Sequence, residues 1–137
     1  RKGMGLRFER KVHEHFAEEL GDGYVPSMWF SYRRLSSPKI VNYAQPDGIF
    51  FDFKLGLVTI IEVKYNHTAE AYFQLYDKYL PLLDKWLHAK EKGLWTFAVC
   101  EVVYWYDKFT DFPCKVSLRD DVRKVKAGEF GVHICRP

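Results

Sequence analysis

Residues 46–65, PDGIFFDFKLGLVTIIEVKY, decide the fold, because two apolar runs flank a single turn signal in this stretch. Both runs are rich in β-branched and aromatic residues, and Leu55-Gly56 lies between them, which is typical of a β-hairpin. A turn centred at Leu55-Gly56 places Asp47 opposite Lys64 across the two strands. The stretch therefore predicts an antiparallel pair with a defined register.

Three ionisable side chains share one face of this hairpin. Side chains alternate along a strand, so Asp47, Glu62 and Lys64 point to the same side, and the rest of that side is apolar. Burying two acids and an amine is costly unless they pair or bind a cation. Two carboxylates beside a lysine suit metal-assisted phosphodiester hydrolysis. The acids hold a hard cation such as Mg²⁺, and the lysine stabilises charge or orients the nucleophile.

A second acid-x-lysine pattern, Asp52-Phe53-Lys54, lies in the same hairpin. Asp52 has the opposite parity to Asp47 and lies about 17 Å further along the strand at ~3.3 Å per residue. The two acids cannot share one metal ion. We interpret Asp52 and Lys54 as the solvated end of the hairpin.

Residues 5–20, upstream of the hairpin, have the periodicity of an amphipathic helix that stops at Gly21-Asp22-Gly23. Its predicted apolar arc holds Leu6, Val12, Phe16, Ala17 and Leu20. Glu9 lies within that arc, where an acid is out of place, and His13 lies beside it. A satisfied, partly buried imidazole is the favoured interpretation of His13, because hard-cation sites prefer oxygen ligands.

The remaining elements surround this core. A strand is expected near residues 28–33, followed by an exposed loop to residue 45, and a helix over 68–88 with a kink at Pro81. Residues 94–105 are the strongest strand signal, residues 117–126 suggest a short helix, and residues 132–135 a last strand. The order α-β-β-β-α-β predicts an α/β fold with a mixed central sheet flanked by helices. Apolar residues on two sides of the 68–88 helix offer one surface for a second subunit.

Length and composition place the chain among globular proteins. Its 137 residues are 47% hydrophobic and 28% charged, which is too apolar for a disordered chain. No run reaches the ~20 apolar residues that a membrane-spanning helix needs. No repeat or linker divides the chain, so residues 1–137 are interpreted as a single domain. The net charge of +3 leaves room for a local basic face.

Cysteine usage points to a reducing compartment. Cys100, Cys114 and Cys135 have none of the spacings typical of zinc or iron–sulphur sites. We expect an intracellular protein, in the cytoplasm or nucleoid. The chain opens Arg1-Lys2-Gly3 with no initiator methionine, so its natural start is expected upstream.

Pro46-Asp47, followed by fourteen residues and then Glu62-Val63-Lys64, resembles the signature of the PD-(D/E)xK nuclease superfamily. This resemblance implies a restriction-endonuclease-like fold, with residues 1–137 forming one nuclease domain. It implies that Asp47, Glu62 and the backbone carbonyl of Val63 bind Mg²⁺, for which Mn²⁺ can substitute, and that Lys64 aligns the attacking water. An acid on the first helix often joins the metal site in this superfamily, and Glu9 matches that role. The alternatives for Glu9 are an acid at a helix edge or an ion pair with Arg33.

Within the superfamily, the Arg1-Lys2-Gly3 start, the helix with Glu9 and the short hairpin look most like archaeal-type and phage Holliday-junction resolvases. The resemblance covers residues 1–20 and 46–66. It implies a phage-encoded or cellular homodimeric DNA endonuclease that cuts four-way junctions in recombination or repair, leaving 5′-phosphate and 3′-hydroxyl ends. Two alternatives remain: a repair, flap or restriction-like nuclease, and a non-catalytic nucleic-acid-binding module of the same fold.

Two basic clusters are candidates for DNA contact. The first lies in a loop-rich, aromatic segment and consists of Arg33, Arg34 and Lys39. The second lies beside the proposed site and consists of Arg1, Lys2, Arg7, Arg10 and Lys11. An ordinary solvated loop is the alternative for the first cluster.

Gln74 has no tyrosine four residues later, as the glutamine–tyrosine motif of the exonuclease branch requires, although Tyr79 is one place beyond. Solvation and function are both open for Gln74, and helical spacing favours a core or dimer role for Tyr72, Tyr76 and Tyr79.

Overall fold

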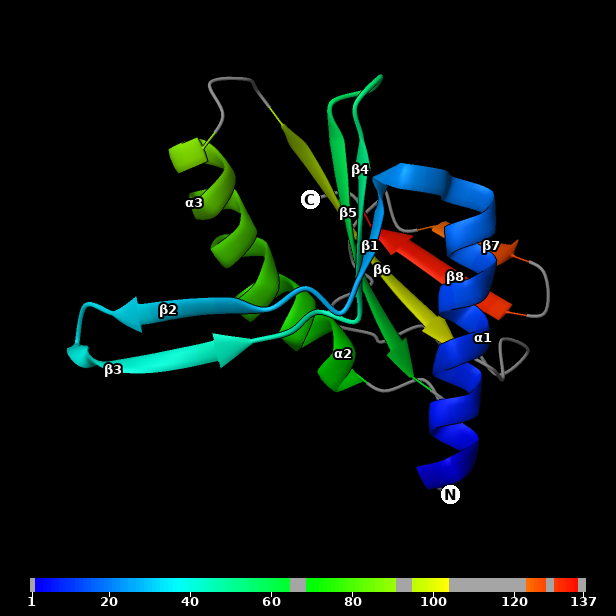
Figure 1. The fold of residues 1–137 in the computed structure, drawn as a ribbon, viewed down its shortest axis with the longest axis horizontal. Helices are drawn as coiled ribbons and strands as arrows, with labels where there is room; N and C mark the ends of the chain where they lie inside the picture. The colour runs from blue at the N-terminus through cyan, green and yellow to red at the C-terminus, as the bar shows by residue number, and fades with distance from the viewer. Residues whose placement is uncertain (1, 65–68, 91–94, 104–122, 128–129, 136–137) are drawn as a thin grey trace.

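Three layers of secondary structure make up the fold, with a helix on one face of a sheet and a broken helix on the other (Figure 1). The computed structural model of the chain describes residues 2–64, 69–90, 95–103, 123–127 and 130–135. Side chains are described within residues 6–64, 70–71, 73–88 and 95–102. In this part of the chain, no helix combines the length and the apolar character needed to cross a membrane.

The central sheet has six strands in the order β1-β4-β5-β6-β8-β7. They are β1 (Tyr24–Pro26), β4 (Gly48–Asp52), β5 (Leu57–Lys64), β6 (Thr96–Val103), β7 (Arg123–Ala127) and β8 (Phe130–Cys135). Strands β5 and β6 are parallel, joined by the helical layer, and the other neighbouring pairs are antiparallel. The predicted α/β class with a mixed sheet is confirmed. The predicted order α-β-β-β-α-β is wrong, since β1 and β3 are extra strands before the helical layer and β7 an extra strand after it.

Helix α1 (Lys2–Leu20) covers one face of the sheet. Its i, i+4 row of Phe8, Val12 and Phe16 is buried against β5 and β6, where it meets Ile61, Val63, Cys100 and Val102. The predicted arc is wrong at two positions, because Leu6 is 67% exposed and Ala17 is also exposed. Burying Phe8 and Phe16 removes more apolar area from water than burying those two residues, so the aromatic row sets the rotation of the helix. Helix α1 ends as predicted at a 3₁₀ turn, Gly21–Gly23, with Gly21 at φ 68°.

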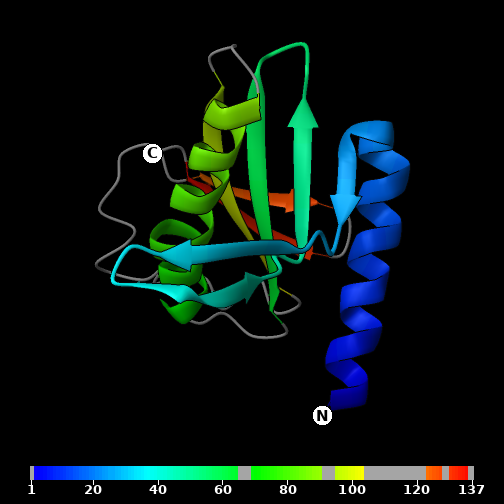
Figure 2. The same cartoon turned by 60° about the vertical axis from the view of Figure 1, so that its left-hand side comes forward.

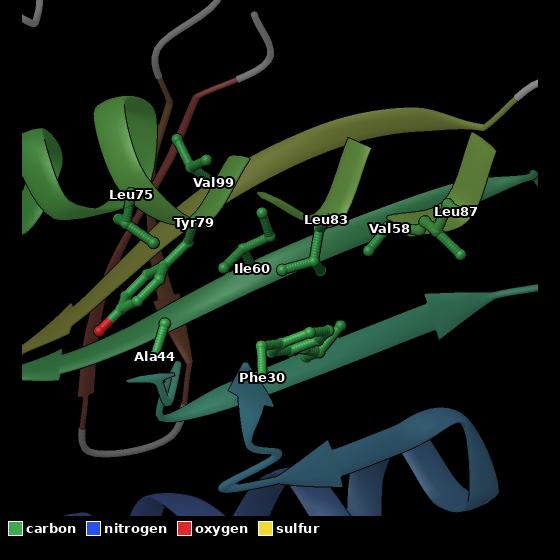
Figure 3. Close-up of a cluster of buried hydrophobic side chains, with 10 residues drawn as sticks. Phe30, Ala44, Val58, Ile60, Leu75, Tyr79, Leu83, Leu87 and Val99 are labelled. Carbon is green, nitrogen blue, oxygen red and sulfur yellow. The ribbon is translucent and has the colours of Figure 1, made fainter. Parts of the chain in front are cut away.

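The opposite face is covered by one helical segment of three parts, α2 (Ala69–Phe73), a π-helix η2 (Gln74–Tyr79) and α3 (Leu80–Lys90). Leu75, Tyr79, Leu83 and Leu87 point from this segment onto β5 and β6 (Figure 3). The predicted kink at Pro81 takes the form of the π-helix just before it. Proline has no N–H for the carbonyl four residues back and its ring presses on that carbonyl, which favours a wider turn.

Residues 34–45 are not the exposed loop that the prolines and serines predict. Strand β2 (Phe30–Arg34) pairs with β3 (Ser37–Ala44) in a two-stranded antiparallel sheet that extends to the side of the helical layer (Figures 1 and 2). The two strands are joined by a turn at Leu35-Ser36. The pairing is irregular opposite Arg33, and Pro38 lies in this bulge. A bulge tolerates a residue that cannot donate to the ladder, so Pro38 does not prevent pairing.

The apolar surplus of the 68–88 helix is covered largely within the chain. Phe30, at the base of β2, packs edge-to-face on Trp86, with their ring centroids 5.4 Å apart. Tyr76, Leu80 and Leu82 also pack against the same buried cluster. Phe30 of the β2–β3 hairpin therefore covers Trp86, one of the apolar residues of the helix that the sequence offered as a dimer surface. Tyr72 lies among the side chains outside the described set.

The carboxyl-terminal segment also differs from the prediction. Residues 123–127 form strand β7 rather than the end of a helix, with Val125 paired to Val132 of β8. The helical spacing of Leu118, Val122 and Val125 competes with the basic–apolar alternation of Lys124-Val125-Lys126, and cross-strand pairing with β8 decides in favour of the alternation. Residues 117–122, including Arg119, lie outside the described part of the chain. The predicted strand 132–135 is confirmed within β8.

The β4–β5 turn sets the register of the central hairpin. The loop is Phe53–Gly56 with Gly56 at φ 61°, and the backbone N–H groups of Lys54 and Leu55 each donate to Asp52 Oδ1 at 3.1 Å. Asp52 thus stabilises the turn, in agreement with its predicted place away from the other acids. The predicted register is wrong by two residues, because Gly48 pairs with Ile61 rather than with Val63. A two-residue shift preserves side-chain parity, so each side chain keeps its predicted face.

Candidate functional site

Asp47, which directly precedes β4, and Glu62 near the end of β5 form an acid pair. Glu62 is 4% exposed, and its carboxyl is hydrogen-bonded to that of Asp47. Burial is the largest cause that raises the pKa of Glu62 to about 9, and the hydrogen bond and negative charge of Asp47 act in the same direction. Burial and the neighbouring acid therefore both favour the protonated form of Glu62. The predicted juxtaposition of these two acids is found in the structure.

The backbone around Asp47 holds its carboxylate in place. The N–H of Val63 donates to Asp47 Oδ2 at 2.7 Å, and the carbonyl of Asp47 accepts from the N–H of Ser27 at 2.9 Å. Gly48 follows immediately, and a Cβ at that position would lie 2.7 Å from the hydroxyl of Tyr24. A side chain at position 48 would therefore force the ring of Tyr24 to move.

Lys64 is the third member that the sequence predicts. Its Nζ lies 4.0 Å from Glu62 Oε2 on the same face of β5, and its side chain is 32% exposed. Its charge lowers the pKa of Glu62, although the effect is smaller than those of burial and Asp47. A half-exposed ammonium beside a buried acid pair can contact both the acids and a ligand that approaches from solvent.

Glu9 is not part of the acid pair itself. It lies on α1, where its Oε1 is 3.4 Å from Nε2 of His13, and Nδ1 of His13 is 2.5 Å from the hydroxyl of Tyr24. Burial raises the pKa of Tyr24, and the charges of Asp47 and then Glu9 raise it further. Glu9 is therefore linked to Tyr24 through His13, and the charge of Asp47 acts on the same tyrosine. The imidazole of His13 is satisfied, as predicted, and among the described residues Glu9 forms its ion pair with His13 rather than with Arg33.

Tyr79 approaches the site from the helical layer, and Gln74 begins the π-helix that ends at Tyr79. The hydroxyl of Tyr79 donates to the carbonyl of Gln45 at 3.4 Å, and burial, Glu62 and Asp47, in that order, raise its pKa. Gln74 and Tyr79 are the first and last residues of the π-helix, in which the N–H of Leu80 bonds the carbonyl of Leu75. In such a helix, residues five apart lie one turn apart, as residues four apart do in an α-helix.

Gln74 is not simply a solvated side chain. Its Oε1 is buried and has no hydrogen-bond partner among the described residues. A buried amide oxygen without a partner costs about 1–3 kcal/mol. The sequence left solvation and function open for Gln74, and the buried oxygen contradicts solvation. Gln74 and Tyr79 are five residues apart, one more than the four that bring two side chains together in an α-helix. The sequence interpretation assumed an α-helix and so did not place them one turn apart.

Glu101 is a buried acid that the sequence interpretation overlooked. It is 0% exposed and lies on β6, in register with Glu62 on one side and His133 on the other. It also raises the pKa of Cys100, for which burial is the larger cause. Glu101 is the only acid in the apolar run 94–103, and this isolated position was a signal that could have identified it.

The basic candidates lie on two different elements. Arg33, Arg34 and Lys39 are all exposed on the β2–β3 hairpin, and Arg7, Arg10 and Lys11 are exposed on α1. The side chains of Arg1 and Lys2 lie outside the described set. The two basic clusters are therefore on separate supports, and the first is on an extended hairpin rather than a loop.

An open cavity of about 850 Å³ lies at the other end of the central hairpin. Its walls are mostly apolar and include Leu55, Leu80 and Trp95, and among the described residues Asp84 is the one acid that lines it. At ~3.3 Å per residue, Leu57 is about 17 Å along β5 from Glu62. The cavity is thus distinct from the acid pair and offers little hydrolytic chemistry.

Within the described residues, no cluster of three or more histidine, cysteine or acidic side chains could hold a metal ion. The Asp47–Glu62 pair supplies two carboxylates, whereas Mg²⁺ commonly takes one or two carboxylates and completes its shell with water and substrate phosphate. The donor set therefore fits Mg²⁺ and not a metal that needs a full protein cage. In comparisons with known proteins, the chain matches no family model, no curated sequence and no solved structure.

Proposed function

We propose that this chain is a Mg²⁺-dependent DNA endonuclease with a restriction-endonuclease-like fold, and that it cuts branched DNA as Holliday-junction resolvases do. The observation that carries the proposal is the pair of the buried Glu62 and the half-buried Asp47, with Lys64 beside it. Two acids that share a proton in a buried site are poised to exchange that proton for a divalent cation. The sequence signature of the PD-(D/E)xK superfamily predicts the same three residues.

Each residue has a role that follows from its position. Asp47 and Glu62 would bind Mg²⁺, with the carbonyl of Val63 as a further ligand, and Mn²⁺ would serve as a substitute. When bound, the cation polarises the phosphate and lowers the pKa of a coordinated water. Lys64 orients the attacking water and balances negative charge at the phosphate. Glu9 acts through His13 and Tyr24, which position Asp47.

Hydrolysis would form one P–O bond to the water oxygen and break the bond to the 3′ oxygen, which leaves a 5′-phosphate and a 3′-hydroxyl. The choice of branched DNA rests on the resolvase resemblance, as does a homodimer that makes paired cuts. The partner is therefore DNA, with recombination or repair as the process served.

A substrate panel with and without Mg²⁺ tests this proposal. We expect internal cuts in a four-way junction with Mg²⁺, weaker cutting of a flap, linear duplex or single strand, and no cutting in EDTA. Preference for linear duplex would overturn the resolvase assignment and leave a repair or restriction-like nuclease. If no substrate is cut with Mg²⁺ or Mn²⁺, the non-catalytic binding module is the better description.

The Gln74–Tyr79 pair favours a second candidate, an exonuclease-like repair enzyme of the same superfamily. In the π-helix these two residues lie one helical turn apart. The glutamine and tyrosine of that branch's motif lie one turn apart through a four-residue spacing. A covalently closed circle carrying an extruded junction separates the candidates, because an end-dependent enzyme cannot cut it. Cleavage of that circle supports the endonuclease, and cleavage only after linearisation supports the exonuclease.

Replacing Gln74 by leucine should separate stability from activity. The change removes a buried oxygen with no partner in the described chain, so the free energy of unfolding should stay constant or rise by about 1 kcal/mol. Cleavage should fall by about tenfold or more if this oxygen contacts a cation, water or nucleotide in the complex. Gln45→Leu is the matched control, because Gln45 Nε2 donates to the carbonyl of Ser27 and its loss should destabilise the fold. A Gln74→Leu variant that is less stable and fully active would contradict a functional role.

A further inference from the structure

The β2–β3 hairpin projects from the three-layered body as a separate two-stranded sheet (Figures 1 and 2). Its base is buried, since Phe30 and its cross-strand partner Ala44 belong to the main apolar cluster. Beyond the Tyr32–Asn42 pair, its side chains are exposed, apart from a half-buried Ser37. The hairpin is therefore an arm with an anchored base and a free outer half.

The base of the arm is tied directly to the acid pair. Only Gln45 and Pro46 separate β3 from Asp47, and the carbonyl of Gln45 accepts a hydrogen bond from Tyr79. On the other side of the base, Ser27 in the connection between β1 and β2 bonds both the backbone of Asp47 and the side chain of Gln45. These bonds hold the arm at a set position relative to the Asp47–Glu62 carboxylates. A molecule gripped by the arm is thereby placed beside the site.

The arm exposes apolar side chains that are not packed in the described part of the chain. In the outer half, Leu35 at the turn is 94% exposed and Ile40 is 59% exposed, and nearer the base Tyr43 is 65% exposed. Trp29, which enters β2, is 64% exposed. Exposed apolar groups concentrated on one projecting element mark an interaction surface.

The charge of the arm selects the partner. Between Asp22 and Asp47 the sequence holds no acid, while Arg33, Arg34 and Lys39 carry three positive charges, as many as the formal net charge of the whole chain. All three side chains are exposed. Two such arms would repel each other, which disfavours a second copy of the chain as the occupant. A polyanion with apolar faces, such as a nucleic acid, complements both the charge and the apolar side chains.

We propose that the β2–β3 hairpin is a DNA-binding arm that recognises branch points, with its basic residues on the phosphate backbone and Leu35 against bases at the branch. The proposal deepens the function proposed above and rests on it for the choice of DNA. A two-stranded ribbon fits the major groove, and apolar side chains inserted between bases must overcome their stacking. Stacking is already interrupted at a branch, so insertion there costs less than in linear duplex. The arm therefore gives the enzyme a preference for branched DNA.

Binding in EDTA tests the arm without interference from cleavage. We measure the affinity of the full chain for a four-way junction and for linear duplex of the same sequence, over a range of salt. Arg33→Ala combined with Arg34→Ala should weaken binding to both DNAs by about tenfold and reduce the salt slope by about two. Leu35→Ser should leave duplex affinity unchanged and lower the preference for the junction several-fold. The matched controls are Lys54→Ala combined with Lys85→Ala, and Leu55→Ser, which change exposed residues outside the arm.

The outcomes separate the arm from the catalytic proposal. If the arginine variant binds like wild type with the same salt slope, the arm is overturned even if Mg²⁺-dependent cleavage persists. If arm variants lose binding but wild type never cleaves, the arm stands and the nuclease assignment fails. If Leu35→Ser converts a dimer to a monomer by sedimentation and leaves junction preference intact, the arm is an interface between copies, and the proposal is overturned.

Discussion

Glu62→Gln should abolish Mg²⁺-dependent cleavage while leaving the protein folded and able to bind junction DNA. The amide matches the protonated carboxyl in shape and can donate to Asp47, so the hydrogen bond within the pair survives. It cannot supply the negative charge that a divalent cation needs. Loss of about 4 kcal/mol of transition-state stabilisation corresponds to a ~10³-fold lower rate.

Single-turnover cleavage of a labelled four-way junction measures this effect, with binding in EDTA measured in parallel. Asp52→Asn is the matched control, because it makes the same change of acid to amide on the same hairpin. Asp52 only accepts two backbone hydrogen bonds in the β4–β5 turn, so this variant should cleave at the wild-type rate. A Glu62→Gln enzyme within about tenfold of wild type would refute the metal role.

The metal-free protein should lose stability as the pH rises from 6 to 9, and Mg²⁺ should restore it. The pKa of Glu62 is raised to about 9 in the folded state, chiefly by burial, while an unfolded glutamate titrates near 4.5. Between these values the folded chain holds a proton that the unfolded chain has released. The contribution of Glu62 is thus fully present below the unfolded pKa and is lost as the pH rises through the folded one.

Thermal unfolding of wild type and Glu62→Gln measures this linkage, since the other titrating groups are common to both. Between pH 6.5 and 8.5 the wild type should lose roughly 2 kcal/mol relative to the variant, or about 6 °C in Tm. Mg²⁺ should raise the Tm of the wild type more at pH 8.5 than at pH 6.5, because it competes with the proton, and should leave the variant unchanged. Parallel Tm curves for the two proteins would show that Glu62 ionises normally and that the pair is no cation site.

The prediction that Asp47, Glu62 and Lys64 share a face was correct although the predicted strand register was wrong. The β4–β5 loop is four residues long and is centred one residue earlier than the sequence suggested, which shifts the pairing by two residues. Because side chains alternate with a period of two, Asp47, Glu62 and Lys64 still share a face. Local alternation was therefore enough to predict which side chains meet, whereas their order along the face depended on the turn.

The errors elsewhere come from competition between local and tertiary preferences. Pro38, Ser36 and Ser37 favoured a loop where the structure has β3 and the turn before it. The packing of Phe30 on Trp86 stabilises the strand pair, and a bulge accommodates Pro38. Val125 fitted a helix by spacing and a strand by alternation, and only the presence of β8 decides between them. Gln74 was placed on a polar helix face because the spacing was interpreted as α-helical.

The sequence by itself determined the mixed α/β class, the central hairpin and the three ionisable groups on one of its faces, since these follow from alternation and composition within a short stretch. Only the tertiary structure decided that Glu9 reaches the site through His13 and Tyr24, that Gln74 has a buried oxygen, and that residues 30–44 form an arm. These features depend on which surfaces of distant segments pack together. Packing is a competition among all buried faces of the chain, and no local pattern records its outcome.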